Sequence, residues 1–135
     1  MAILKGVKNK IDVKVTAKLD SDNGRTEQVT FIVTYKKPNV EEQRELQARI
    51  NPDINDNGDP VVDPITDQEI VDEYVLGWKE VPTETGEPFD FTPENVDAMM
   101  SAREYRAAII EGLLTAVFGK GALAKNSSNR GGLGR

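Results

Sequence analysis

Cysteine and histidine are both absent from the 135 residues of this chain. Their absence removes thiolate nucleophiles, imidazole bases, disulfides and the commonest zinc ligands, so most familiar catalytic and metal chemistries have no residues to use. No apolar run approaches the roughly 20 residues that a membrane-spanning helix needs, and the first residues lack the apolar core of a signal peptide. We therefore expect a cytoplasmic protein that is not an enzyme, holds no cofactor and does not contact a membrane.

Basic residues are scarce in the middle of the chain, although the net charge is only −6. From Asp53 to Asp97 the one basic residue is Lys79, whereas residues 120–135 carry four basic residues and no acid. Subtracting that +4 from −6 leaves −10 for residues 1–119. A body of this charge repels nucleic acid, so any phosphate or acidic partner is expected at the C-terminal segment. The alternative interpretation of that segment is a solvated end without a partner.

Two runs of alternating apolar and polar residues predict an antiparallel β-hairpin. In residues 11–19 the apolar side chains fall on one side of the run, and residues 29–35 repeat this pattern with valine, phenylalanine and tyrosine. Asn23 and Gly24 lie between the runs and tolerate a positive φ, so we place the turn there. An isolated hairpin is marginal in water, so helices must cover its apolar face.

The segments after the hairpin predict about four helices. Asn39 with Glu42 matches a capping box and predicts the first helix start. Residues 51–64 are rich in aspartate, asparagine, glycine and proline and predict a loop. A second capping box, Thr66 with Glu69, opens a helix that is expected to include Tyr74 and Val75, to end at Gly77 and to place Trp78 at its end.

Two further helices are predicted near the C-terminus. Thr92-Pro93 is typical of a helix start, because threonine can cap and proline suits the first helical position. Ser101 with Glu104 forms a third predicted capping box, and apolar residues then recur at helical spacing until Gly119. We therefore predict an α+β fold with one domain over residues 1–119. Residues 120–135 have the composition of a flexible linker.

One loop segment partly matches an EF-hand calcium loop. Its oxygen-bearing residues recur at alternate positions, and glycine occupies the sixth position; they are Asp53, Asn55, Asn57 and Asp59. The twelfth position should be a bidentate glutamate but is Pro64. A turn whose side chains bond their own backbone is the favoured interpretation, and calcium binding is the alternative.

Between Asp72 and Asn126 several motifs follow one another in a fixed order: Gly77-Trp78-Lys79, the polar turn Gly86-Glu87-Pro88, Phe89 to Val96, the helix from Tyr105 to Phe118, and Lys125-Asn126. In the order and spacing of these motifs the segment resembles the tail assembly chaperones of long-tailed bacteriophages. An upstream strand and a helix rich in glutamate, glutamine and arginine extend the match over residues 25–126. The loop Asp53 to Asp63 departs from the family and looks like an insertion, and the glycine-rich basic end is a second departure.

The resemblance implies a binding role in the host cytoplasm. Members of this family bind the tape measure protein, keep it soluble until tail tube subunits polymerise around it, and are then absent from the mature virion. In several relatives a frameshifted, longer form recruits the tail tube protein, and the linker-like end of this chain would suit such a junction. None of the family's residues is catalytic. The shared motif positions are Gly77, Trp78, Phe91, Thr92, Pro93, Glu94 and Asn95.

A client-binding protein of this kind needs an accessible apolar surface. We predict that this surface lies near Trp78 and Phe91, or on one face of the last helix, made of Tyr105, Ile109, Leu113 and Val117. For each of these regions, packing in the core is the alternative. The binding interpretation of Trp78 is kept because tryptophan is enriched at binding hot spots. The competing function is a structural virion component, such as a small tail or head-completion protein. The sequence leaves the oligomeric state open, a homo-oligomer included.

Overall fold

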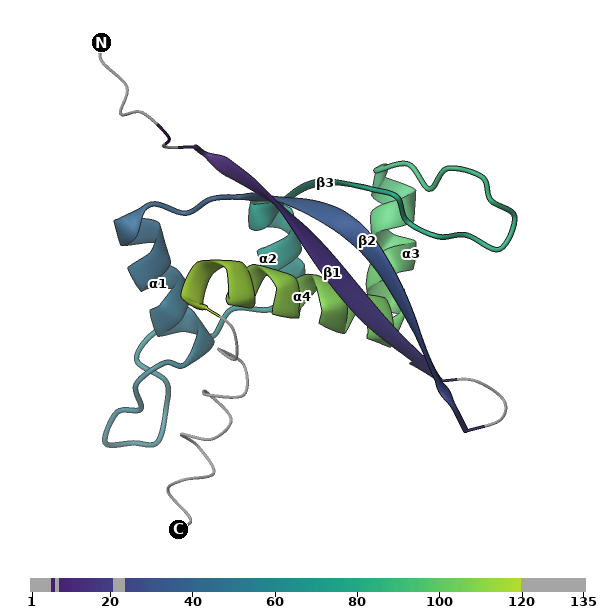
Figure 1. Cartoon of the computed structure of the whole chain (residues 1–135). Coiled ribbons are helices and arrows are strands. Elements are labelled where there is room, and N and C mark those ends of the chain that lie inside the picture. The colour runs from purple at the N-terminus through teal and green to yellow at the C-terminus, as the bar shows by residue number, and fades with distance from the viewer. Residues whose placement is uncertain (1–5, 7, 21–23, 120–135) are drawn as a thin grey trace.

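The computed structural model of this chain describes residue 6, residues 8–20 and residues 24–119. Its elements in chain order are β1 (Lys10–Asp20), β2 (Thr26–Lys36), α1 (Val40–Ile50), α2 (Asp67–Tyr74), β3 (Val75–Lys79), α3 (Pro93–Ser101) and α4 (Arg103–Phe118). They form an α+β fold in which helices cover one face of a small antiparallel sheet (Figure 1). The predicted tail, residues 120–135, lies outside the described residues.

The two strands of the predicted N-terminal hairpin are confirmed. β1 and β2 pair antiparallel from Lys10 opposite Lys36 to Asp20 opposite Thr26. Alternate side chains of both strands point to the helices and are buried, and these are Val15, Ala17, Phe31, Val33 and Tyr35. Asn23, at the predicted turn, lies outside the described residues. Gly24 has φ +72, which glycine adopts at little cost because it has no Cβ atom to clash with the backbone.

A third strand replaces the end of a predicted helix. α2 ends at Tyr74, and the prediction that it continues to Gly77 is wrong. Val75 is extended, with φ −86 and ψ 116, and β3 pairs antiparallel with the free edge of β2, where Trp78 lies opposite Val33. Pairing with β2 satisfies the backbone of Val75–Lys79 and buries the β-branched Val75. This gain depends on a partner distant in the sequence and outweighs the local helical spacing.

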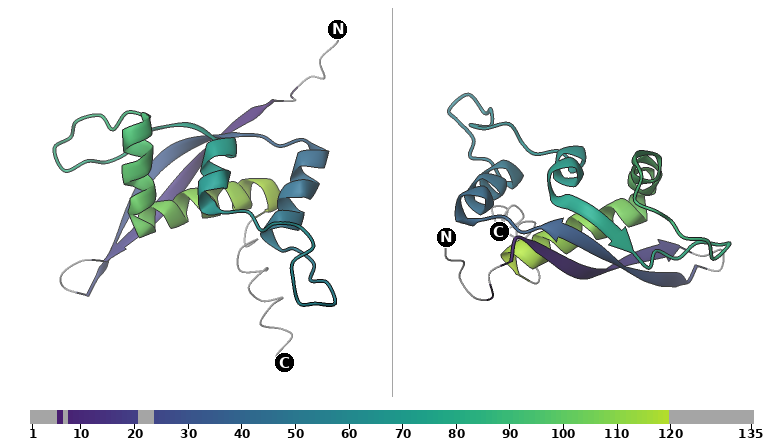
Figure 2. Two further views of the ribbon diagram at one scale, coloured as in Figure 1. Left: turned by 180° about the vertical axis from the view of Figure 1, so that it is seen from behind. Right: turned by 90° about the horizontal axis from the view of Figure 1, so that it is seen from above.

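The helices lie on one face of the sheet, and no described element covers the opposite face, which we call the open face (Figure 2). α4 crosses beneath β1 and β2, and α2 packs beside it against β2 and β3. All elements contribute to one core, whose largest fully buried side chains are Tyr35, Phe31, Leu46, Ile109, Leu113 and Val33. The exposed side chains of β1 on the open face are polar, as the alternating pattern predicts.

Three of the four predicted helix starts have the expected caps. The Asn39 and Thr66 side chains each accept from the backbone N–H three residues on and complete capping boxes with Glu42 and Glu69. Thr92 caps α3 by accepting from the Asn95 N–H, with proline at the first helical position. These caps satisfy backbone donors that the first helical turn leaves without intrahelical partners.

The predicted capping box at Ser101 is wrong. Ser101 is the last residue of α3, and its hydroxyl donates to the Asp97 carbonyl. The N-cap of α4 is Ala102, which supplies no side-chain hydrogen bond. The Ala102 N–H bonds to the Met99 carbonyl, so α3 closes with a tight last turn and α4 begins directly after it. The predicted end of α4 is confirmed, because Gly119 caps it.

Candidate functional site

Three aromatic side chains form a cluster at the end of β3. The Trp78 ring stacks on Phe89, with centroids 5.8 Å apart, and Phe91 meets it edge to face at 4.8 Å. The Trp78 indole N–H donates to the Phe89 carbonyl at 2.7 Å. Offset and edge-on ring pairs of this kind are favourable beyond the area they bury. We call Trp78, Phe89 and Phe91 the aromatic cluster.

The loop from residue 80 to residue 92 positions this cluster. Directly after β3, Glu80 has φ 61, an unusual left-handed conformation for a residue with a side chain, and it turns the chain away from the sheet. Thr83 closes the loop by donating its hydroxyl hydrogen to the Glu87 carbonyl at 2.8 Å. At the other end, the Asn95 amide of α3 donates to the Asp90 carbonyl at 2.8 Å. The backbone around Phe89 and Phe91 is thereby hydrogen-bonded to β3 through Trp78 and to α3 through Asn95.

The aromatic cluster is accessible from the surface. Phe91 is 41% exposed, and Trp78 and Phe89 are half-buried. Next to the cluster lies a mainly apolar hollow between the loop, α3 and the start of α4. Its apolar lining comprises Val81, Pro82, Phe89, Ala98, Met99, Ala102 and Tyr105. This surface has the composition of a protein-binding site, because aromatic residues and methionine are enriched in such sites.

The loop that carries Phe89 and Phe91 is rich in acidic side chains. Five exposed carboxylates belong to this loop and the first turn of α3, and they are Glu80, Glu84, Glu87, Asp90 and Glu94. The nearest basic residue before this stretch is Lys79, the last residue of β3, and residues 80–94 contain no lysine or arginine. An apolar surface on such an acidic loop complements a ligand with an apolar stripe and basic flanks.

The structure brings together only some of the predicted binding residues. Trp78 and Phe91 are in contact, and Tyr105 borders the hollow while its ring lies 5.7 Å from Phe31. Ile109 and Leu113, with 1% and 0% exposure, pack in the core beneath the sheet. A partner that leaves this fold intact cannot reach those two side chains, so their assignment to an exposed client-binding face is corrected to core packing.

Val117, on the last turn of α4, is half-buried and packs against the core. It lies three helical turns beyond Tyr105 and does not line the hollow beside the aromatic cluster. Of the predicted helical face, Tyr105 alone therefore belongs to the candidate site.

The EF-hand-like loop forms a turn closed by its own side chain. The Asn55 carboxamide oxygen accepts from the backbone N–H groups of Asn57 and Asp59, at 2.9 and 3.0 Å. Gly58 has φ +85 and completes the turn, and Ile54 bridges to Pro60. Within the described residues there is no group of three or more acidic side chains that could hold a metal ion. The oxygen of Asn55 is thus engaged by the backbone, as the turn interpretation predicts for such side chains.

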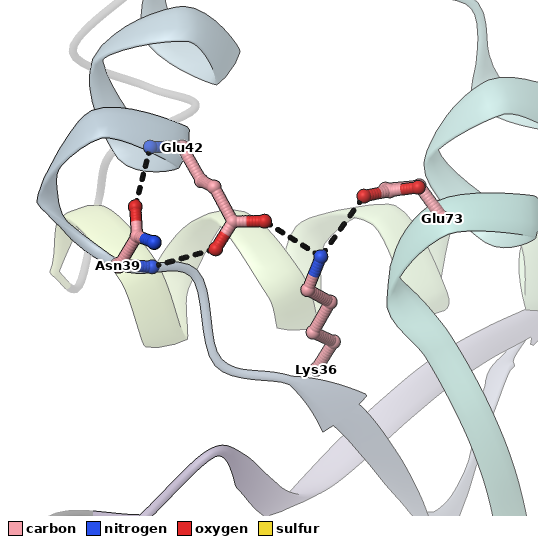
Figure 3. Close-up of polar contacts among 4 residues, drawn as sticks. All are labelled: Lys36, Asn39, Glu42 and Glu73. Atoms are coloured by element: carbon pink, nitrogen blue, oxygen red, sulfur yellow. Dashed lines mark hydrogen bonds and ion pairs between the residues drawn. The ribbon is translucent and has the colours of Figure 1, made fainter.

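A lysine network links the end of β2 to two helices (Figure 3). Lys36 Nζ donates to Glu42 of α1 at 2.6 Å and to Glu73 of α2 at 3.0 Å. Glu42 also accepts from the backbone N–H of Asn39 at 3.1 Å. The hydrogen bond to Glu42, followed by the one to Glu73, raises the pKa of Lys36, and the same bond with Lys36 lowers the pKa of Glu42. The network therefore stabilises the charged form of both groups.

The other shifted groups also have pKa values that move further from neutral pH. Desolvation by burial raises the pKa of the tyrosines Tyr35, Tyr74 and Tyr105. The hydrogen bond from Arg49, at 2.7 Å, lowers the pKa of Glu69 and ties α1 to the start of α2. None of these shifts prepares a group for proton transfer near neutral pH, which requires a pKa close to the working pH.

Comparison with protein-family models, with curated proteins and with solved structures finds no match. None of the described helices is both long enough and apolar enough to cross a lipid bilayer.

The sequence predicts Trp78 and Phe91 as binding residues, and Phe89 is not among the predicted set. Phe89, Asp90 and Phe91 alternate between apolar and acidic side chains, which signals two rings on the same side of an extended segment. The contact of both rings with Trp78 depends on the return of the loop toward β3, and no local pattern indicates that return.

Proposed function

We propose that this protein is a tail assembly chaperone that binds a bacteriophage tape measure protein and keeps it soluble before tail tube assembly. The observation that carries the proposal is the convergence of the resembling motif on one surface. Trp78 and Phe91 are thirteen positions apart in the sequence, and their rings meet at 4.8 Å. Thr92 and Asn95 of the same motif cap α3 and anchor the loop that carries Phe91.

The chemistry of this surface suits a helical client. Tape measure proteins are long and largely helical, so a segment with an apolar stripe would expose that stripe until the tube encloses it. The aromatic cluster and the adjacent hollow offer apolar contacts, and the five carboxylates of the loop and of the first turn of α3 favour basic residues beside the stripe. Helix-in-groove recognition works through a few apolar anchors of this kind.

The proposal is tested by co-expression with a tape measure protein encoded in the same genome. We expect the tape measure protein to be soluble with the wild-type chain and to aggregate with Phe91→Ser, which removes the most exposed ring of the cluster. Truncation of an aromatic hot spot weakens binding by tenfold or more. Val62→Ser is the matched control, because Val62 is 40% exposed, close to the 41% of Phe91, and lies in the loop between α1 and α2.

Two outcomes would contradict the proposal. In the first, the tape measure protein stays soluble without this chain. In the second, mass spectrometry finds the chain in purified mature virions, which would favour a structural virion component. A longer frameshifted form that recruits the tail tube protein is part of the same proposal, and mass spectrometry of infected cells would detect its extension.

A further inference from the structure

β1 is a long strand at the edge of the sheet. Among the described strands, in the order β1-β2-β3, it pairs with β2 alone, and it is eleven residues long. In Figure 2 no described element lies beyond its outer edge. Free edges of this length are usually shortened, bulged or covered, because their unpaired backbone groups can add a further strand. Within the described residues, β1 is paired without interruption and has no bulge.

The hydrogen bonds to β2 show which backbone groups of β1 are available. The Lys37 N–H donates to the Asn9 carbonyl at 2.9 Å, so the pair of residues 9 and 37 is a hydrogen-bonded one. Such pairs alternate along an antiparallel ladder, so the odd-numbered residues of β1 bond to β2. The even-numbered residues, from Lys10 to Asp20, therefore direct their N–H and C=O groups to the free edge.

We propose that β1 pairs antiparallel with β1 of a second copy of this chain, about a two-fold axis at Val15. In this register the residue numbers of each pair sum to 30. The even-numbered residues then exchange hydrogen bonds, as their orientation requires. Lys10 faces Asp20 of the second copy, Asp12 faces Lys18, and Lys14 faces Thr16. Every charged pair is of opposite sign, and opposite charges directly across a strand pair are favourable.

Neighbouring registers are unfavourable because they align like charges. A shift to a sum of 28 places Lys10 opposite Lys18 and Lys14 opposite its own copy. A shift to 32 places Asp12 opposite Asp20 and Lys14 opposite Lys18. Odd sums are excluded, because they would pair an outward-facing residue with one that bonds to β2. The sum of 30 is also the register that uses all eleven residues.

The apolar side of β1 supports the same register. Ile11 is 37% exposed although it lies on the side of the strand that faces the helices. In the proposed pair it lies opposite Leu19 of the second copy, and Val13 lies opposite Ala17. Leu19 and Val13 are only partly buried in the single chain. Pairing would bury these side chains further and produce one continuous six-stranded sheet.

The first test is the oligomeric state of the full chain, measured by sedimentation equilibrium. We expect a dimer that dissociates about tenfold more readily in Lys10→Asp or in Asp20→Lys, since each change sets two like-charged pairs across the axis. The combined variant Lys10→Asp/Asp20→Lys should restore wild-type association. A monomeric wild-type chain, or a dimer that both single variants leave unchanged, would overturn the proposal.

The second test blocks the free edge without changing charge. The Thr16 N–H faces outward, so Thr16→Pro removes an edge donor while the bonds to β2 remain. It should abolish the dimer, whereas the matched variant Thr16→Val should keep it. Circular dichroism establishes whether the proline variant is folded. If it is unfolded, the charge-exchange result decides the question.

The third test measures the register. The chain has no cysteine, so Lys14→Cys and Thr16→Cys can be made without background. In the proposed pair these positions have Cα atoms about 5.5 Å apart, within the range of a disulfide. Mixing the two variants under oxidation should give cross-linked heterodimers. Either variant alone would have to bridge a diagonal of about 7–8 Å and should cross-link poorly. Efficient cross-linking of one variant alone would contradict this register.

This inference does not depend on the proposed chaperone function. The aromatic cluster lies beside β3, at the opposite edge of the sheet from β1. Failure of the dimer tests would leave the Phe91 experiment valid, and loss of client binding would leave the dimer tests valid.

Discussion

Gly112 is the point of closest approach between α4 and the sheet. A Cβ atom at this position would lie 2.5 Å from Cγ1 of Val15 and 2.6 Å from Oη of Tyr35. Both neighbours are buried, and the Tyr35 hydroxyl is held by donation to the Ile109 carbonyl at 2.6 Å. Replacement by alanine in a helix normally stabilises by about 1 kcal/mol, but overpacking a tight core costs about 1–3 kcal/mol. With two clashes we expect the upper end, and Gly112→Ala should destabilise by about 2 kcal/mol net.

Urea unfolding measures this prediction, with the fluorescence of Trp78, the one tryptophan in the chain, as the signal. At a typical slope of about 2 kcal/mol per molar urea, the midpoint should fall by about 1 M. Ala107→Gly is the control, because Ala107 is exposed on the same helix and should lose about 1 kcal/mol from helix propensity alone. Tyr35→Phe should destabilise less in the Gly112→Ala chain than in wild type, since it removes one clash. A Gly112→Ala chain as stable as wild type, or more stable, would refute the proposed close packing.

Three further predictions concern polar contacts of the fold. Tyr35→Phe alone should lower the free energy of unfolding by about 1 kcal/mol in urea, because the bond to Ile109 is lost; an unchanged midpoint would contradict this. Thr92→Ala should lower the free energy of unfolding by about 1 kcal/mol in the same assay, because the α3 cap is lost. Thr92→Ser keeps a hydroxyl at the cap and should retain most of that stability. Glu42→Gln should destabilise the protein at neutral pH. The pKa of Glu42 is lowered from 4.5 by Lys36, so its contribution is present above that value and lost as the pH falls through the folded pKa. Unfolding between pH 7 and pH 3 should show the gap from wild type closing below about pH 4.5, and a gap independent of pH would be inconsistent with the ion pair.

The hairpin and the helix caps could be predicted because their signals are local. Alternation along residues 11–19 and 29–35 specifies which side of each strand is buried, and a capping box needs only residues three positions apart. β3 could not be predicted in this way. Tyr74 and Val75 continue the helical spacing of α2, and the change to strand at Val75 is stabilised by pairing with β2, about forty residues earlier in the sequence.

The candidate site was only partly predictable for a similar reason. Trp78 stands out by its residue type and its motif, but its contacts with Phe89 and Phe91 require the loop to return across the end of β3. The apolar spacing of α4 was equally suited to a core or to a binding face. The sheet decides between them, because α4 crosses under β1 and buries Ile109 and Leu113 completely.

Hydrogen–deuterium exchange on the purified complex with the tape measure protein tests the proposed function most directly. The proposal predicts slower amide exchange in residues 78–91 on binding, around the aromatic cluster and the adjacent hollow. Exchange in α1, residues 40–50, should be unchanged. Failure of the two proteins to form a complex, or protection confined to α1 or to the loop at residues 51–64, would contradict the proposal.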